Sequence, residues 1–189
     1  MKRTFAYISM TALIALWFGP PARAAEKAAG YSAEMMTKIE EVQRERAAVE
    51  KNLKTFDELD FVVFSNQEWT RLHESHSRYV KVHWPDGHMT SGIEKHIEDL
   101  KAMFVYAPDT NIAVHPVKFG SAEWTSVIGV MTGTFSKPMP IGDGRFIQPT
   151  GKKFNITMCT VGHWKDGVMD EEYLFWDNAT FMKQIGLAQ

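Results

Sequence analysis

Two strand-like runs separated by a short turn decide the fold: residues 154–176 read FNITMCTVGHW, then KDG, then VMDEEYLFW. Both runs are rich in β-branched and aromatic residues, which is typical of strands. Gly167 suits the left-handed position of a three-residue hairpin loop. The sequence therefore predicts an antiparallel hairpin of residues 154–164 and 168–176, joined by residues 165–167.

The register of this hairpin sorts its side chains into two faces. A three-residue loop pairs His163 with Met169 and Asn155 with Asp177, whereas a two-residue loop would shift the register by one residue and separate His163 from Asp177. One face is mixed and carries Asn155, His163, Met169, Glu171, Tyr173, Phe175 and Asp177. The other is almost wholly apolar and carries Phe154, Ile156, Met158, Trp164, Leu174 and Trp176.

Binding pockets are mostly apolar with a few converging polar groups, so we interpret the mixed face as a pocket wall. A solvated sheet face is the alternative. The apolar face would then point outward. Exposing it would cost about 25 cal/mol per Å² of apolar surface, which predicts a homodimer through the outer sheet face.

Before this hairpin, helices precede strands. The expected helices cover residues 35–56, 61–76 and 93–104, and the expected earlier strands cover residues 112–119 and 124–135. Ser91 and Glu94 have the spacing of a capping box, and the proline- and glycine-rich residues 136–151 predict a loop. Helices first and strands later, without alternation, favour an α+β fold with an antiparallel sheet.

Composition limits the class of protein. The chain has 189 residues, of which 44% are hydrophobic and 23% charged, as expected for one globular domain. Its formal charge of −2 gives no basic excess for binding nucleic acid. The single cysteine, Cys159, cannot form a disulfide within the chain or a thiolate zinc site by itself.

The first 24 residues resemble a secretory signal. Lys2 and Arg3 precede an apolar run of 15 residues at positions 4–18, and Ala22-Arg23-Ala24 has the spacing of a signal peptidase site. A membrane anchor is the weaker alternative, because a spanning helix needs about 20 residues. We expect cleavage after Ala24 and a periplasmic or secreted chain that does not associate with the membrane. The expected organisation is a signal peptide at 1–24, a helical lead-in at 25–58 and a domain at 59–189.

A series of landmarks resembles a known family. In chain order the landmarks are Gly133-Thr134-Phe135, PTGKK at 149–153, WKDG at 164–167, Glu171 with Tyr173 and Asp177, and Gln184-Ile185-Gly186. Pro108-Asp109 also fits. In this order and spacing they resemble the SnoaL-like polyketide cyclases, also called ester cyclases, over residues 61–187.

This resemblance implies a nuclear transport factor two-like fold, in which a strongly bent antiparallel sheet and N-terminal helices form a cone around a pocket. It implies an intramolecular aldol cyclisation without cofactor or metal. Asp177 stands where the family has its acid/base aspartate, and His163 stands where it has a second polar pocket residue. Two features depart from the family: the expected export, and Val161 at a position that is polar in the cyclase.

The candidate site residues follow from the mixed face and the resemblance. We expect Asp177 and His163 to be catalytic, and the expected ligand-binding residues are Tyr173, Glu171, His83, Asn155, Phe104 and Trp124. Asp177 also suits a second role, as the N-cap of a short helix at residues 178–185. No metal site is expected, because zinc needs three or four converging ligands and only His73 and His76 are held close by their spacing.

Two functions remain open at this point. The first is cofactor-free acid/base chemistry on a small hydrophobic carbonyl or polyketide-like compound, such as cyclisation, isomerisation or dehydration. The second is a non-catalytic periplasmic protein that holds a small hydrophobic ligand in the same pocket.

Overall fold

The computed structural model describes residues 31–189, and these fall into two units, residues 31–41 and 42–189. The described part of the first unit carries the start of helix α2 (Ala33–Glu58). The expected signal peptide and its cleavage site lie outside the described residues. Within residues 31–189, no helix is long and apolar enough to cross a membrane.

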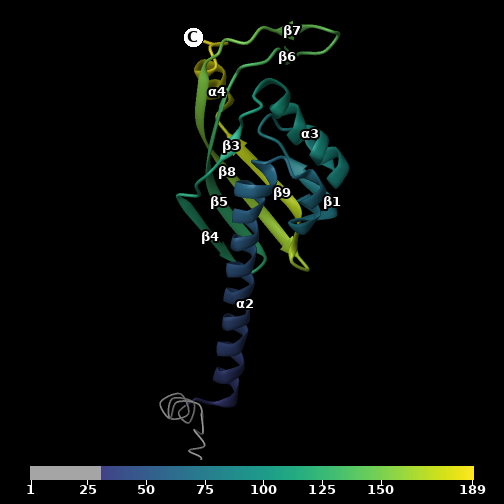
Figure 1. The fold of residues 1–189 in the computed structure, drawn as a ribbon. Coiled ribbons are helices and arrows are strands. Elements are labelled where there is room, and N and C mark those ends of the chain that lie inside the picture. Colours follow the sequence, from purple (N-terminus) through teal and green to yellow (C-terminus); the bar gives the residue numbers. More distant parts are fainter. Residues whose placement is uncertain (1–30) are drawn as a thin grey trace, which may run out of the picture. The chain divides into compact units, whose positions relative to one another are not determined.

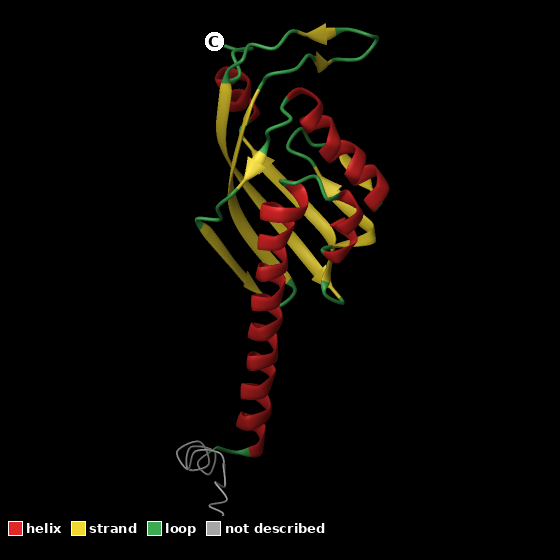
Figure 2. Ribbon diagram, in the orientation of Figure 1, coloured by secondary structure: helices red, strands yellow, loops and turns green. Residues whose placement is uncertain are grey.

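The second unit combines a curved sheet with short helices (Figures 1 and 2). The helical elements after α2 are a π-helix η1 (Leu59–Phe64), a 3₁₀-helix η2 (Trp69–Glu74), α3 (Ile93–Tyr106) and α4 (Asn178–Gln184). The main sheet contains β1 (His76–His83), β2 (Met89–Ser91), β3 (Asn111–Ile112), β4 (Val117–Ser121), β5 (Trp124–Thr134), β8 (Lys153–Lys165) and β9 (Val168–Trp176). A separate small hairpin pairs β6 (Met139–Pro140) with β7 (Phe146–Ile147).

The sheet order is β2-β1-β9-β8-β5-β3, with β4 also paired to β5. Every pair is antiparallel except β1 with β9, which is parallel. The expected α+β fold with a curved, mainly antiparallel sheet is confirmed.

The hairpin of β8 and β9 turns through two residues rather than the expected three. Lys165 pairs with Val168, and the turn residues Asp166 and Gly167 have φ angles of 53° and 86°. Positive φ at both positions gives a turn whose twist matches that of the flanking strands, and Asp-Gly is a preferred sequence for it.

A bulge in β9 then returns most side chains of the hairpin to the faces that were expected for them. Trp164 pairs with Met169, but His163 pairs with Glu171, so Asp170 is an extra residue on one strand. Beyond this bulge the expected grouping of side chains holds. Met169 is the exception, because it lies on the core side of the bulge and is 0% exposed.

The apolar face of the hairpin points into the core, so the interpretation of the mixed face as the pocket wall is wrong. Phe154, Ile156 and Leu174 pack in one cluster with Phe64 of η1 and Phe104 of α3. Burying these side chains is favourable, whereas burying the charged groups of the mixed face would carry a large desolvation cost. The apolar face therefore needs no second chain to cover it, and the homodimer stays an untested expectation.

Two local expectations in the first half of the chain also differ from the structure. Residues 61–76 do not form one helix: η1 and η2 are separated by a turn, and strand β1 begins at His76. Helix α3 has Gly92 as its N-cap with φ of 93° and no side-chain cap, so the expected capping box does not form. The strands β1 and β2 were not predicted.

A pair of substitutions tests the bulge. We expect Met169→Ala to lower the free energy of unfolding by about 2–5 kcal/mol, as for other buried Met→Ala changes. Phe175→Ala should cost within about 0.5 kcal/mol, because Phe175 is 53% exposed. Urea denaturation followed by circular dichroism measures both, and similar costs for the two variants would contradict the register.

Candidate active site

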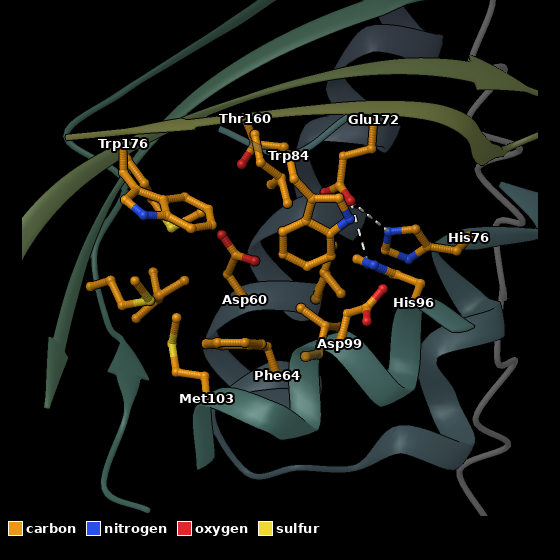
Figure 3. A pocket seen from close by; sticks show the side chains of 16 residues that line it. Asp60, Phe64, His76, Trp84, His96, Asp99, Met103, Thr160, Glu172 and Trp176 are labelled. Carbon is orange, nitrogen blue, oxygen red and sulfur yellow. Dashed lines mark ion pairs between the residues drawn. The ribbon is translucent and has the colours of Figure 1, made fainter. Parts of the chain in front are cut away.

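A cavity of about 60 Å³ lies between the concave face of the sheet and the helices η1 and α3 (Figure 3). Its lining is mostly apolar and includes Trp84, Met103 and Trp176. The polar side chains that line it are Asp60, His76, His96, Asp99, Thr160 and Glu172. About 10–15 Å³ of such space is enough for one water molecule, so the cavity has room for a small ligand.

Asp60 reaches this cavity because α2 continues into the wider turn of η1. There the backbone N–H of Ser65 donates to the Asp60 carbonyl, five residues earlier, at 3.3 Å. Such π-helical turns are rare and occur often at functional sites. Asp60 is 8% exposed, and Figure 3 shows its carboxylate directed into the cavity.

His115, in the segment between β3 and β4, joins Asp60 to a second carboxylate. Its Nε2 lies 2.8 Å from Asp60 Oδ2, and its Nδ1 lies 2.8 Å from Asp57 Oδ1. The imidazole side chain is 1% exposed and packs against Phe61, with ring centroids 4.4 Å apart. Asp57 in turn forms an ion pair with Lys118. The result is a continuous polar chain from the cavity to the surface.

This chain must contain a proton beyond that of a neutral imidazole. A neutral ring donates from only one nitrogen, so two carboxylate contacts require either an imidazolium or a protonated carboxyl group. Burial raises the pKa of Asp60. Burial opposes charge on His115, but the hydrogen bonds with Asp60 and Asp57 raise its pKa overall.

Asp57 behaves differently from Asp60. Burial alone would raise its pKa, but hydrogen bonds from Lys118 and His115 bring it below the ordinary value. Asp57 is therefore the charged end of the chain. The raised pKa values of His115 and Asp60 favour a proton shared between these two groups, and Asp60 is the one that faces the cavity.

A second polar cluster lies in the same cavity. Glu172 Oε2 of β9 is 3.4 Å from His96 Nε2 of α3 and 3.7 Å from His76 Nε2 of β1. His76, His96 and Glu172 are 2%, 2% and 4% exposed. Burial lowers the pKa of His96 to about 4, so its ring is neutral at pH 7. Burial alone would raise the pKa of Glu172, but its contacts with His76 and His96 lower it.

Five of the expected site residues gather on the outer face of the sheet and do not line the cavity. His83 Nε2 lies 2.8 Å from Glu171 Oε1, and its ring stacks on Tyr173 with centroids 4.1 Å apart. Trp124 lies beside His163, with centroids 4.7 Å apart. The prediction that these five residues line the cavity is therefore wrong, although they were expected to lie close to one another. A functional role for this outer cluster stays a prediction.

The remaining expected residues are separated. Asp177 caps helix α4 by accepting hydrogen bonds from the N–H groups of Ala179 at 2.9 Å and Thr180 at 3.2 Å. The Thr180 hydroxyl, which donates to Asp177 Oδ2 at 2.6 Å, lowers the pKa of Asp177 most, and these N–H groups lower it further. Asn155 is exposed, and Phe104 is buried in the core. An acid/base catalyst needs a pKa near the working pH, so the geometry of Asp177 favours capping, while its catalytic role stays a prediction.

Sequence reasoning missed Asp60, His76, His96, His115 and Glu172 as a set. They come from separate helices, strands and loops, so local spacing carries no signal of their convergence. One signal was available. Glu172 lies on the same face of the predicted strand as Leu174 and Trp176. A charged residue on an otherwise apolar strand face indicates a buried polar group, which is a signal of function.

Comparison with solved structures identifies the fold class. The chain is similar to a candidate SnoaL-like polyketide cyclase from Jannaschia sp. CCS1, with 19% identity, a TM-score of 0.65 and coverage of 75% of this chain and 95% of that one. It is also similar to IdmH, a candidate polyketide cyclase from Streptomyces antibioticus, with 21% identity and a TM-score of 0.61. This match covers 71% of this chain and 98% of IdmH. These likenesses confirm a nuclear transport factor two-like fold with a strongly curved sheet.

The family follows from the sequence match. The model of the SnoaL-like polyketide cyclase family matches residues 54–185, which is more than half of the chain. The protein belongs to the SnoaL-like polyketide cyclase family, as its landmarks indicated. A search of curated proteins gave no match. The expected segment boundaries at residues 24 and 58 stay predictions.

The polar chain predicts the titration of His115. In an NMR titration, we expect the His115 ring to lose its proton at a pH above 6.5, the ordinary pKa of histidine. Because the folded chain holds this proton more tightly than the unfolded chain, its contribution to stability is complete below pH 6.5 and is lost as the pH rises through the raised pKa. Asp60→Asn removes one carboxylate partner and should lower the pKa of His115.

Asp170→Asn is the matched control, because Asp170 Oδ1 lies 2.6 Å from Nδ1 of another histidine, His163. It should lower the pKa of His163 and leave His115 unchanged. A pKa of His115 at or below 6.5 in the wild-type chain would contradict the proposed proton position.

The cap at Asp177 gives a separate prediction. Asparagine caps helices about as well as aspartate, whereas alanine does not. We expect Asp177→Asn to keep the wild-type midpoint of urea unfolding and Asp177→Ala to lower it. If the two variants lose stability equally, the charge of Asp177 contributes more than its capping hydrogen bonds.

Proposed function

We propose that this protein is an enzyme that moves a proton at the carbon next to a carbonyl group, with Asp60 as the acid/base. The observation that carries the proposal is the Asp60 carboxyl group in the cavity, 2.8 Å from His115 Nε2. Membership of a cyclase family supports chemistry of this kind. The raised pKa of Asp60 supports it further, because proton transfer is most efficient when the pKa lies near the working pH.

The first step is removal of a proton from the substrate. With the shared proton on His115, the Asp60 carboxylate takes a proton from the carbon next to the carbonyl, and the electron pair moves to the carbonyl oxygen as an enolate. His115 stabilises the ionised Asp60 before this step and keeps its carboxyl group oriented. The buried Thr160 lines the same cavity, and its hydroxyl is the candidate donor to the enolate oxygen.

The second step returns the proton. In a cyclisation, the enolate carbon attacks a second carbonyl carbon of the same molecule, a carbon–carbon bond forms, and the new alkoxide takes the proton from Asp60. In an isomerisation, the proton returns to a different carbon. Both sequences regenerate the Asp60 carboxylate and need no oxidant or reductant.

The substrate is small and hydrophobic. Trp84, Met103 and Trp176 supply apolar contact around the cavity, and the cavity volume of about 60 Å³ favours a small carbonyl compound or the reacting end of a longer one. The proposal includes export to the periplasm, which rests on the sequence of residues 1–24 alone.

Asp60→Asn tests the proposal, because asparagine keeps the shape of the side chain but does not exchange a proton at neutral pH. A panel of small ketones and β-keto esters in D₂O is monitored by NMR for deuterium at the carbon next to the carbonyl. We expect the wild-type chain to accelerate exchange of at least one compound, and Asp60→Asn to reduce that acceleration by about 10²–10⁴-fold.

Asp143→Asn serves as the control for an aspartate on the surface, since the side chain of Asp143 is 89% exposed. Deuterium exchange at the wild-type rate by Asp60→Asn would contradict the proposal. Loss of exchange in Asp177→Asn alone would favour the assignment made from the sequence. Tight binding of the panel without exchange, measured by tryptophan fluorescence, would favour the non-catalytic binding protein.

A further inference from the structure

The second polar cluster of the cavity has the geometry of a metal site. One ligand atom from each of His76, His96 and Glu172 lies within 4.8 Å of the other two, and Figure 3 shows the Glu172 carboxylate directed at both imidazoles. Ligand atoms bound at 2.0–2.1 Å to a tetrahedral zinc ion are about 3.3–3.4 Å apart. The observed separations of 3.4 and 3.7 Å between Glu172 Oε2 and the two Nε2 atoms are close to that spacing.

The hydrogen bonds of Ser75 determine which nitrogen of His76 carries the hydrogen. The Ser75 hydroxyl lies 3.1 Å from the Leu72 carbonyl oxygen, to which it donates, and 2.9 Å from His76 Nδ1. A hydroxyl has one hydrogen, so Ser75 accepts the hydrogen bond from His76 Nδ1–H. In the neutral ring, His76 Nε2 then presents a lone pair toward the cavity. Metal-binding histidines are commonly oriented in this way, by a hydrogen bond from the second ring nitrogen.

This arrangement leaves two acceptors facing each other. His76 Nε2 and Glu172 Oε2 are buried, and neither has a hydrogen-bond partner among the described residues. They are 3.7 Å apart, which is too long for a hydrogen bond. Buried polar atoms are nearly always paired, and a cation between these two atoms would satisfy both the nitrogen lone pair and the carboxylate oxygen.

We infer that His76, His96 and Glu172 bind one divalent transition-metal ion in the cavity. Two imidazole nitrogens and one carboxylate oxygen suit zinc, iron(II) and cobalt(II). Three protein ligands leave coordination positions open toward the cavity, as in catalytic rather than structural sites. Such a site adds to the cofactor-free chemistry of the family, and it does not depend on the proposed role of Asp60.

Cobalt(II) is the direct probe, because its visible absorption reports both binding and coordination geometry. The full chain is treated with chelator, dialysed and titrated with cobalt(II), then with zinc as a competitor, and under anaerobic conditions with iron(II). We expect one ion per chain, a cobalt spectrum of low coordination number, and a thermal unfolding midpoint that rises with metal concentration. The order of competition distinguishes a zinc site from an iron site.

Glu172→Gln should weaken cobalt binding by more than about 100-fold, because the loss of even an outer-shell partner costs 10–100-fold. His73→Gln is the matched control: His73 is exposed, and its ring contacts the Thr70 carbonyl oxygen at 2.8 Å. It should bind cobalt as the wild-type chain does. Asp60→Asn should also keep the metal while losing proton transfer, which separates this inference from the proposed function.

The wild-type chain alone can overturn the inference. Absence of the cobalt spectrum and of any metal-dependent rise in the unfolding midpoint would show that water or a proton fills the gap between His76 and Glu172. Equal binding by Glu172→Gln and His73→Gln would show that the metal is held elsewhere on the surface. Circular dichroism in the near ultraviolet shows whether each variant retains its tertiary packing.

Discussion

Burial of charge inside an apolar cavity is the constraint on which this site depends. A carboxylate removed from water must find a partner or become neutral. Asp60 meets this requirement through His115, at 2.8 Å. Glu172 meets it less completely, because its two imidazole neighbours are 3.4 and 3.7 Å away. The contrast between the two carboxylates gives them different chemistry: Asp60 shares a proton, whereas Glu172 faces a gap that suits a cation.

Much of the fold could be predicted because strand periodicity and turn chemistry are local. Residues 124–135, 154–164 and 168–176 were each expected to form strands, and each does so within one or two residues. The long first helix and the last short helix were also expected. Strand β1 was not expected, because its sequence HSRYVKVH contains few apolar residues. In addition, its pairing partner β9 lies more than 80 residues further along the chain.

The site could not be predicted in the same way, because it depends on which face of the sheet is concave. The alternation of polar and apolar side chains along β8 and β9 identified the two faces of the sheet but not the direction in which the sheet bends. A mixed polar face and a pocket wall have the same composition, so the outer cluster around His83 and Tyr173 was interpreted as the site. The bulge at Asp170 added a second difficulty, since a single extra residue transfers Met169 from one face to the other.

The two clusters of the cavity are also coupled through their charges. The carboxylate of Glu172 raises the pKa of Asp60, in addition to the larger effect of burial. A divalent cation bound to Glu172 would replace this negative charge with a net positive one. In a cavity of low dielectric constant, that change favours the ionised form of Asp60 and lowers its pKa. An ion at His76, His96 and Glu172 would therefore favour the ionised Asp60 that accepts the proton in the proposed first step, even without touching the substrate.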